Sequence, residues 1–316
     1  MESHEAVLTR VAWLYYIQGL TQGEIAQRLG YSRTKVVRLL AKAREQGLVS
    51  IELKSPFGAC YELEKRIKEV FGLREAVVVP TGQSEQINKA GIAKAAALLL
   101  ERMLKDGDVI GASWGTTVCE VGRQLGALRR RDLVLVQMMG GTNALAGPIN
   151  PLEVVKLLAT KLGARGFWLN APLIVDSAEI KEAIVSDVGV RQVLDMTGMV
   201  NVALIGIGDL NNNSSLVACN LIQPEMMVRL MRRGAVGDIF GQYFDERGAY
   251  VPSGLEDRMI AFPIDRLKHI PVVIGVAGGA RKVTPILGGL RGRLMNVLVT
   301  DENTAQQILA ANKARP

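Results

Sequence analysis

From Glu75 onward, short apolar runs alternate with helix-length segments, and this alternation constrains the fold more than any other feature of the chain. The runs are rich in β-branched residues and apolar along almost their whole length, which is typical of parallel strands buried on both faces. The expected strands are 76–79, 109–112, 133–138, 166–169, 202–207, 272–277 and 295–299. The expected helices between them include 86–104, 117–125, 151–162 and 224–233. The pattern predicts a Rossmann-like parallel α/β domain.

Composition excludes several classes of protein. With 316 residues, 48% of them hydrophobic, the chain is long enough for two domains and can bury a sizeable core. No apolar run reaches the length of a membrane span, and the acidic start lacks the pattern of a secretory signal. The three cysteines are scattered without a CxxC, so we expect neither disulfides nor metal, and a cytoplasmic location. Only His4 and His269 could serve histidine chemistry, and no cofactor is expected.

The N-terminal segment combines a local excess of positive charge with a sequence pattern typical of three helices. Six basic residues and no acidic one lie between positions 28 and 44. Residues 7–18 predict a first helix, and Thr21 followed by Glu24 predicts a capping box at the start of a second. Ser32 is expected to cap a third helix, 33–46, with an inner face of Val36, Val37, Leu39, Leu40 and Ala43. Two short helices joined by a tight turn predict a helix-turn-helix.

Basic and polar residues near the start of the third helix lie clear of its apolar stripe, where a recognition helix meets base edges. The expected DNA contacts are Gln22, Tyr31, Ser32, Arg33, Thr34, Lys35 and Arg38. Residues 47–53 alternate like a short strand and could form a wing. An ordinary helical bundle with a basic surface is the alternative. Pro56 and Gly58 mark a boundary, which gives a DNA-binding domain at 1–55 and an effector-binding and oligomerisation domain at 56–316.

The loop after the second expected strand has the character of an anion site. Residues 111–117 combine small residues and hydroxyls with a following helix N-terminus. Neither a GxxxxGK[ST] nor a GxGxxG motif is present, so nucleotide binding is not indicated. A tight turn that binds nothing is the alternative. The loops 137–143, 206–209 and 275–282 are expected at the same edge of the sheet, and there Arg281 and Lys282 oppose a helix dipole unless an anion is bound.

The whole chain resembles the sorbitol-operon-regulator (SorC) family of bacterial transcription regulators. The motifs that carry the resemblance are 21–26 and 31–40 in the first domain, and 111–116, 234–239, 243–245, 278–282 and 297–301 in the second. The resemblance implies a DNA-binding domain, an effector domain similar to sugar-phosphate isomerases, and a homo-oligomer, expected to be a tetramer. It implies binding of double-stranded operator DNA and of a sugar, usually phosphorylated.

Carried onto this chain, the resemblance assigns effector contacts at three places. Ser113, Gly115, Thr116 and Thr117 would hold the phosphate, and Gly111, at the start of the same loop, is a further expected effector contact. Gln137, Asn143, Asp238 and Lys282 would line the sugar side or reach the phosphate. Trp114 could stack on the sugar or simply pack.

Two other functions remain as alternatives. One is an isomerase- or deaminase-like enzyme with an appended helix-turn-helix. The related deaminases carry a histidine after a Gly-Ile-Gly-like strand end, whereas residues 208–213 contain none and His269 lies elsewhere. The other is a DNA-binding scaffold protein that responds to no ligand, against which the anion-shaped loop argues. The sequence therefore favours a regulator without catalytic residues.

Overall fold

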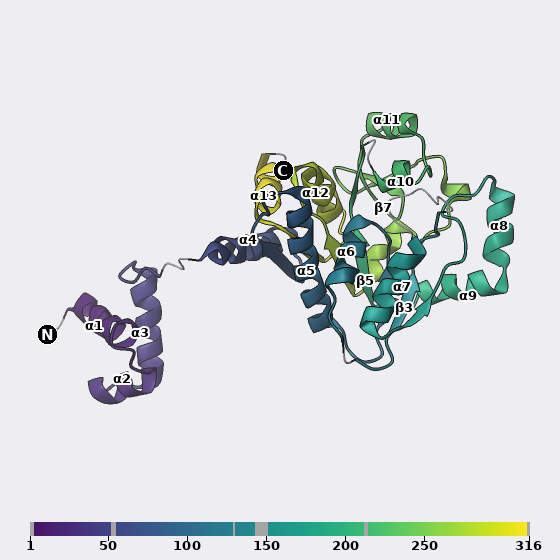
Figure 1. Ribbon diagram of the computed structural model, residues 1–316. Coiled ribbons are helices and arrows are strands. Elements are labelled where there is room, and N and C mark those ends of the chain that lie inside the picture. The colour runs from purple at the N-terminus through teal and green to yellow at the C-terminus, as the bar shows by residue number, and fades with distance from the viewer. Residues whose placement is uncertain (1–2, 52–54, 129, 143–150, 212–213, 315–316) are drawn as a thin grey trace. The chain divides into compact units, whose positions relative to one another are not determined.

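The computed structural model describes residues 3–51, 55–128, 130–142, 151–211 and 214–314. The chain divides into two compact units, Met1–Ser55 and Pro56–Pro316 (Figure 1). Each unit has its own hydrophobic core.

The small unit is a helix-turn-helix, as the sequence predicts. Its helices are α1 (His4–Tyr16), α2 (Gln22–Leu29) and α3 (Arg33–Glu45). The expected capping box is present: the Thr21 amide donates to Glu24 Oε2 at 2.7 Å, and the Glu24 amide donates to Thr21 Oγ1 at 3.3 Å. Gly30 ends α2 at φ +64°, a left-handed conformation that favours glycine. The core is apolar and comprises chiefly Leu8, Val11, Ile25, Val36 and Leu40.

Two details of this unit differ from the sequence-based expectation. Val37 is 43% exposed rather than part of the inner face, because the stripe that contacts α1 and α2 runs through Val36, Leu39 and Leu40. The described part of the expected wing, residues 47–51, is a turn followed by irregular backbone instead of a strand. A strand needs a hydrogen-bonded partner, and the described residues of this unit offer none. Residues 52 and 53 of that prediction lie outside the described ranges.

The large unit contains the predicted parallel sheet. Its seven strands are β1 (Glu75–Val79), β2 (Val109–Ala112), β3 (Val134–Gln137), β4 (Arg165–Phe167), β5 (Val202–Gly206), β10 (Val272–Val276) and β11 (Val297–Asp301). They lie in the order β1-β11-β10-β5-β2-β3-β4, and every pair is parallel. Each strand expected from the sequence is present, with its ends displaced by at most two residues.

Helices cover both faces of this sheet (Figure 1). The chain moves from β1 towards β4 and then from β5 back towards β11, so right-handed crossovers place the two groups of helices on opposite faces. One group is α5 (Glu85–Met103), α6 (Thr116–Gln124) and α7 (Pro151–Leu162). The other includes α4 (Pro56–Phe71), α12 (Val283–Arg291) and α13 (Glu302–Ala314). No helix among the described residues combines the length and apolarity that crossing a membrane requires.

The reversal of chain direction falls between β2 and β5, which are neighbours in the sheet. The loop after β2 leads into α6 on one face, whereas the chain after β5 leaves towards the other group. Diverging connections at such a point open a crevice beyond the carboxyl ends of the strands, where α/β proteins bind ligands.

A second, antiparallel sheet adjoins this crevice and was not predicted from the sequence. It consists of β6 (Gly208–Asp209), β7 (Ala235–Ile239), β8 (Gln242–Asp245) and β9 (Tyr250–Val251). Gly208 pairs with Asp238, so the second sheet brings this carboxyl to the end of β5. The remaining helices of the unit are α8 (Ala178–Ser186), α9 (Val188–Thr197), α10 (Ser215–Ala218), α11 (Pro224–Arg232) and three short 3-10 turns, Glu256–Arg258, Ile264–His269 and Ala280–Lys282.

Candidate functional site

A cavity of about 780 Å³ lies at the carboxyl edge of the parallel sheet. Its walls are the loops that follow β1, β2, β5 and β10, together with parts of β7 and α10. Segments far apart in the sequence therefore meet there, including 81–85, 113–118, 206–209 and 277–282. This is the crevice that the strand order produces.

The N-terminus of α6 faces this cavity without a side-chain cap. Gly115 is the N-cap residue, and no side chain accepts a hydrogen bond from the first turn. A Cβ atom on Gly115 would meet nothing within 4 Å, so open space adjoins this end of the helix. Lys89 Nζ donates to Thr116 Oγ1 at 3.3 Å and adds a positive charge to the helix dipole. Uncapped amides, hydroxyls and a cation together favour an anionic ligand group.

Ser113 joins the two strands that flank the crevice. Its amide donates to Leu204 O at 3.2 Å, and its hydroxyl accepts a hydrogen bond from the Gly206 amide at 3.3 Å. The loop after β2 is therefore fixed to the end of β5. Ser113 also lines the cavity, and its hydroxyl keeps its own proton to donate.

Asp209, on β6, pairs with two cations of the 3-10 turn Ala280–Lys282, which precedes α12. Lys282 Nζ donates to Asp209 Oδ1 and, at 2.9 Å, to Ile207 O. Arg281 Nε lies 3.9 Å from Asp209 Oδ2, and a terminal guanidinium nitrogen of Arg281 lies 3.6 Å from Glu85 Oε1. The predicted conflict between the two cations and the helix dipole is resolved by this carboxylate, which supplies the anion within the chain.

Asp238 is a carboxyl that the protein surrounds on most sides while part of it faces the cavity. Burial raises the pKa of Asp238 from its ordinary value of 3.8 to about 6. Lys282 and a hydrogen bond from the Gly241 amide, at 3.3 Å, limit the rise, whereas the negative charge of Asp209 adds to it. Asp238 therefore accepts hydrogen bonds as a carboxylate at neutral pH and becomes protonated in mild acid.

Asp301, at the end of β11, holds three walls of the cavity together. Its side chain is fully buried. It accepts hydrogen bonds from Thr81 at 3.0 Å, Asn88 at 3.1 Å, the Gly279 amide at 2.9 Å, and both the amide and the hydroxyl of Thr304 at 3.0 and 2.6 Å. Burial alone would raise the pKa of Asp301, but these hydrogen bonds outweigh it and hold the pKa below its usual value.

Two glycines make this arrangement possible. A Cβ atom on Gly278 would collide with the Asp301 carboxylate and with Ile92. Gly279 has φ +98°, a conformation that other residues rarely adopt, and this turn points its amide at Asp301 and at Thr304 Oγ1, 2.7 Å away.

The structure brings most of the predicted effector residues together. Those that line the cavity are Ser113, Trp114, Gly115, Thr116, Thr117, Asp238 and Lys282. Trp114 is only 6% exposed and its indole donates to Gly140 O at 2.9 Å, which favours packing over stacking on a ligand. Asn143 lies outside the described residues.

Two predicted residues do not line the cavity. Gly111 lies within β2, where a Cβ atom would collide with Met138, so the glycine serves packing of the sheet. Gln137 is 3% exposed and its amide donates to Met139 O at 2.8 Å, so it supports the neighbouring loop. Conversely, Thr81, Asn88 and Lys89 were not predicted, and Asp301 entered only as the last residue of the motif 297–301 without a role, because their roles depend on contacts between distant segments. No group of three or more His, Cys, Asp or Glu side chains that could hold a metal ion occurs among the described residues.

The predicted DNA contacts lie on one exposed part of the small unit. Ser32, Arg33, Thr34, Lys35 and Arg38 are exposed at the start of α3, and Gln22 and Tyr31 are partly exposed nearby. Ser32 Oγ accepts a hydrogen bond from the Lys35 amide at 3.2 Å and so caps α3. Lys35 Nζ lies 3.7 Å from the centre of the Tyr31 ring, a cation–π contact that restricts the lysine.

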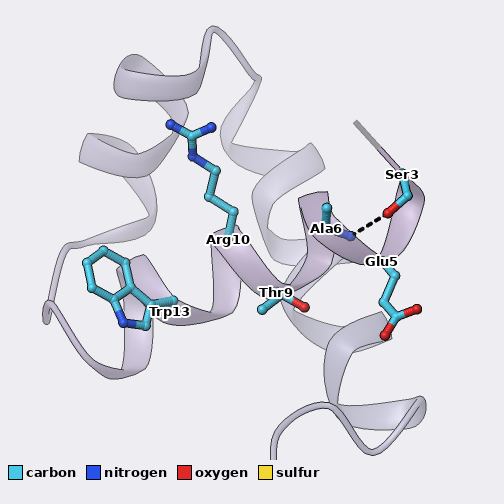
Figure 2. A pocket seen from close by; sticks show the side chains of 6 residues that line it. All are labelled: Ser3, Glu5, Ala6, Thr9, Arg10 and Trp13. Carbon is cyan, nitrogen blue, oxygen red and sulfur yellow. Dashed lines mark hydrogen bonds between the residues drawn. The ribbon is translucent and has the colours of Figure 1, made fainter. Parts of the chain in front are cut away.

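A second hollow of the protein lies along α1 (Figure 2). All six of its lining residues, Ser3, Glu5, Ala6, Thr9, Arg10 and Trp13, come from α1 and its cap. Figure 2 shows the hydrogen bond from the Ala6 amide to Ser3 Oγ, 3.2 Å long, which begins the helix. One helix surface cannot enclose a small molecule, so the cavity of the large unit is the candidate ligand site.

Comparison with known proteins assigns both units. Residues 55–310 match a family model of sugar-binding domains, and residues 11–56 match the MarR family. The chain is 32% identical to the transcriptional regulator LsrR of Enterobacter sp. (strain 638), over 98% of this chain and 94% of the relative. It is 31% identical to the sorbitol operon regulator of Klebsiella pneumoniae, over 96% and 97% of the two chains.

A solved structure agrees over nearly the whole chain. The crystal structure of full-length SorC from Klebsiella pneumoniae superposes with a TM-score of 0.75 at 30% sequence identity, and covers 98% of this chain and 100% of that one. These relatives are transcriptional regulators and not enzymes, which decides against the isomerase-like alternative. A helix-turn-helix unit, a sugar-binding α/β unit and similarity along both units place this chain in the SorC family of DNA-binding transcriptional regulators.

Proposed function

We propose that this cytoplasmic protein binds operator DNA through α3 and controls a carbohydrate-utilisation operon in response to a phosphorylated sugar in the cavity of the large unit. The observation that carries the proposal is the uncapped N-terminus of α6 in the wall of a 780 Å³ cavity. The phosphate group would accept hydrogen bonds from the amides and hydroxyls of Ser113, Gly115, Thr116 and Thr117.

The sugar hydroxyls would lie against the other wall of the cavity. Asp238 offers a carboxylate acceptor there and Lys282 a donor. The hydrogen bonds of Asp301 hold the loops after β1 and β10 in place before the ligand arrives. Because the groups that would contact the ligand are already positioned, little binding free energy is spent on ordering them.

A panel of sugar phosphates and the corresponding free sugars, screened by thermal shift, tests the effector. A ligand at 100-fold over its Kd adds about 2.7 kcal/mol to the free energy of unfolding, which raises Tm by a few degrees. We expect only phosphorylated compounds to raise Tm. If only the free sugars do so, the phosphate assignment at α6 is wrong.

Replacing Arg38 with alanine tests the DNA-binding face. Arg38 is exposed on α3 beside the other predicted contacts, so its loss should weaken operator binding about tenfold. If it contacts a phosphate, the slope of log K against log salt should fall by about 0.9. The measurement is fluorescence anisotropy on an operator fragment that the protein selects from a random library. Arg229→Ala on α11, also exposed, is the matched control. Unchanged affinity and slope would remove Arg38 from the interface.

Control by the effector requires that the ligand bind two conformations with different affinity. We propose a homo-oligomer, with a tetramer expected, that presents two or more copies of α3 to one operator. Binding of the sugar phosphate would change how these copies are spaced. A saturating effector that alters neither DNA affinity nor oligomer size contradicts this switch and instead supports a ligand-independent DNA-binding protein.

A further inference from the structure

The two ends of the cavity differ in charge. At one end lie the N-terminus of α6, Thr116 and the ammonium group of Lys89. No carboxylate of the described residues is hydrogen-bonded or ion-paired to Lys89 in this structure, so that end keeps its positive potential. An anionic ligand group is favoured there.

At the other end, the cationic side chains are paired with carboxylates. Both oxygens of Asp209 are engaged, Oδ1 by Lys282 and Oδ2 by Asn211 at 2.6 Å, with Arg281 Nε 3.9 Å away. Arg281 also approaches Glu85 within 3.6 Å, and Asp238 lies beside Lys282.

The net charge of this end of the cavity is therefore not positive. Among the described residues of the wall, three carboxylates face two cations there: Glu85, Asp209 and Asp238 against Arg281 and Lys282. A second phosphate group would find its counter-ions already neutralised and would lie close to like charges.

Helix α5 carries one residue of each end. Lys89 contacts the α6 end and Glu85 contacts Arg281 at the other, and the Cβ atoms of these residues, one helical turn apart, lie about 5 to 6 Å from each other. Both ends therefore belong to one cavity wall that a single sugar or polyol can contact. Its phosphate would reach α6 while its far hydroxyls meet the carboxylates, which accept hydrogen bonds from neutral hydroxyl groups.

We propose that the cavity selects sugar or polyol monophosphates and discriminates against bisphosphates, and that Asp209 is the residue that sets this preference. The inference rests on the proposed function, since it presumes that one phosphate binds at α6. A second phosphate carries a charge of about −1.5 to −2, and the carboxylates around Lys282 repel it. The far end of the ligand is therefore expected to be uncharged.

The test compares matched ligand pairs on the full-length protein by isothermal titration calorimetry. The probes are glucose 6-phosphate with glucose 1,6-bisphosphate, fructose 6-phosphate with fructose 1,6-bisphosphate, and ribulose 5-phosphate with ribulose 1,5-bisphosphate, each with its free sugar. For the pair that binds, we expect the monophosphate to have at least tenfold the affinity of the bisphosphate. A bisphosphate that binds as tightly as its monophosphate overturns the inference and leaves the proposed function intact. Binding of free sugars alone overturns both.

The variant Asp209→Asn tests the role assigned to this residue. It keeps the size of the side chain but frees Lys282 and Arg281 from a negative charge, so the affinity ratio of bisphosphate to monophosphate should rise about tenfold. Glu225→Gln on α11, an exposed carboxylate outside the cavity, should leave the ratio unchanged. Thermal unfolding of each variant shows that it is folded. An unchanged ratio in folded Asp209→Asn means that Asp209 does not set the preference.

Discussion

Replacing Asp301 with asparagine is expected to lower the free energy of unfolding by about 3 kcal/mol at pH 7 and to weaken effector binding at the same time. All the groups that hydrogen-bond to this carboxylate are donors, and they approach both of its oxygens. An asparagine must turn its own NH₂ group towards one set of them. In either orientation donors face donors in a buried place, and the loops after β1 and β10 lose a common anchor.

The pH dependence of stability gives this prediction a second readout. The pKa of Asp301 is lower in the folded protein than in the unfolded chain, so its contribution to stability is fully present above about pH 4, the unfolded value. That contribution is lost as the pH falls through the folded pKa. The difference between wild type and Asp301→Asn should therefore be largest at neutral pH and shrink in acid.

Urea unfolding between pH 3 and pH 7 measures this difference. Asp245→Asn is the matched control, because Asp245 Oδ1 alone accepts from the Arg247 and Ala249 amides and an asparagine oxygen can do the same. We expect the control to change the unfolding midpoint little. Equal midpoints for wild type and Asp301→Asn at pH 7 would contradict the anchoring role of Asp301.

The features that the sequence predicts are those with local signals. The helix-turn-helix follows from Thr21 and Glu24, three positions apart, and from Gly30 and Ser32 at the helix ends. The parallel sheet follows from apolar runs that are buried on both faces and so need no alternation. The position of residues 113–117 in the cavity wall follows from their place between a strand and a helix.

The features that could not be predicted depend on contacts between distant segments. Asn88 and Asp301 are 213 positions apart, and no sequence pattern near either residue indicates the hydrogen bond between them. The second sheet has two strands of only two residues, too short for any periodicity to be read. Gly111 shows a further limit: a glycine required by Met138, just after the neighbouring strand β3, looks, in sequence, the same as one that would admit an anion.

Replacing Asp238 with asparagine is expected to stabilise the ligand-free protein at pH 7 while weakening effector binding. The pKa of Asp238 is raised from 3.8 to about 6 in the folded state, mainly by burial, so ionising it costs more in the folded protein than in the unfolded chain. The stability of the wild type therefore falls as the pH rises from about 4 through 6. The size of the rise in pKa corresponds to about 2 to 3 kcal/mol at neutral pH. A neutral asparagine avoids this cost and its oxygen can still accept from the Gly241 amide.

Chemical unfolding at pH 4 and pH 7, with calorimetric titration of the effector found in the panel, tests both halves of this prediction. The stabilisation by Asp238→Asn should be about 2 kcal/mol or more at pH 7 and should nearly vanish at pH 4, where the folded wild type is already protonated. Effector affinity should fall about tenfold, since a carboxylate is a stronger acceptor for hydroxyls than an amide. Asp195→Asn on the exposed side of α9 is the control and should change neither quantity. If Asp238→Asn is less stable than wild type at pH 7, Lys282 compensates the buried charge of Asp238 fully. Asp238 would then stabilise the fold, and would not be a ligand-binding group that is retained at a cost in stability.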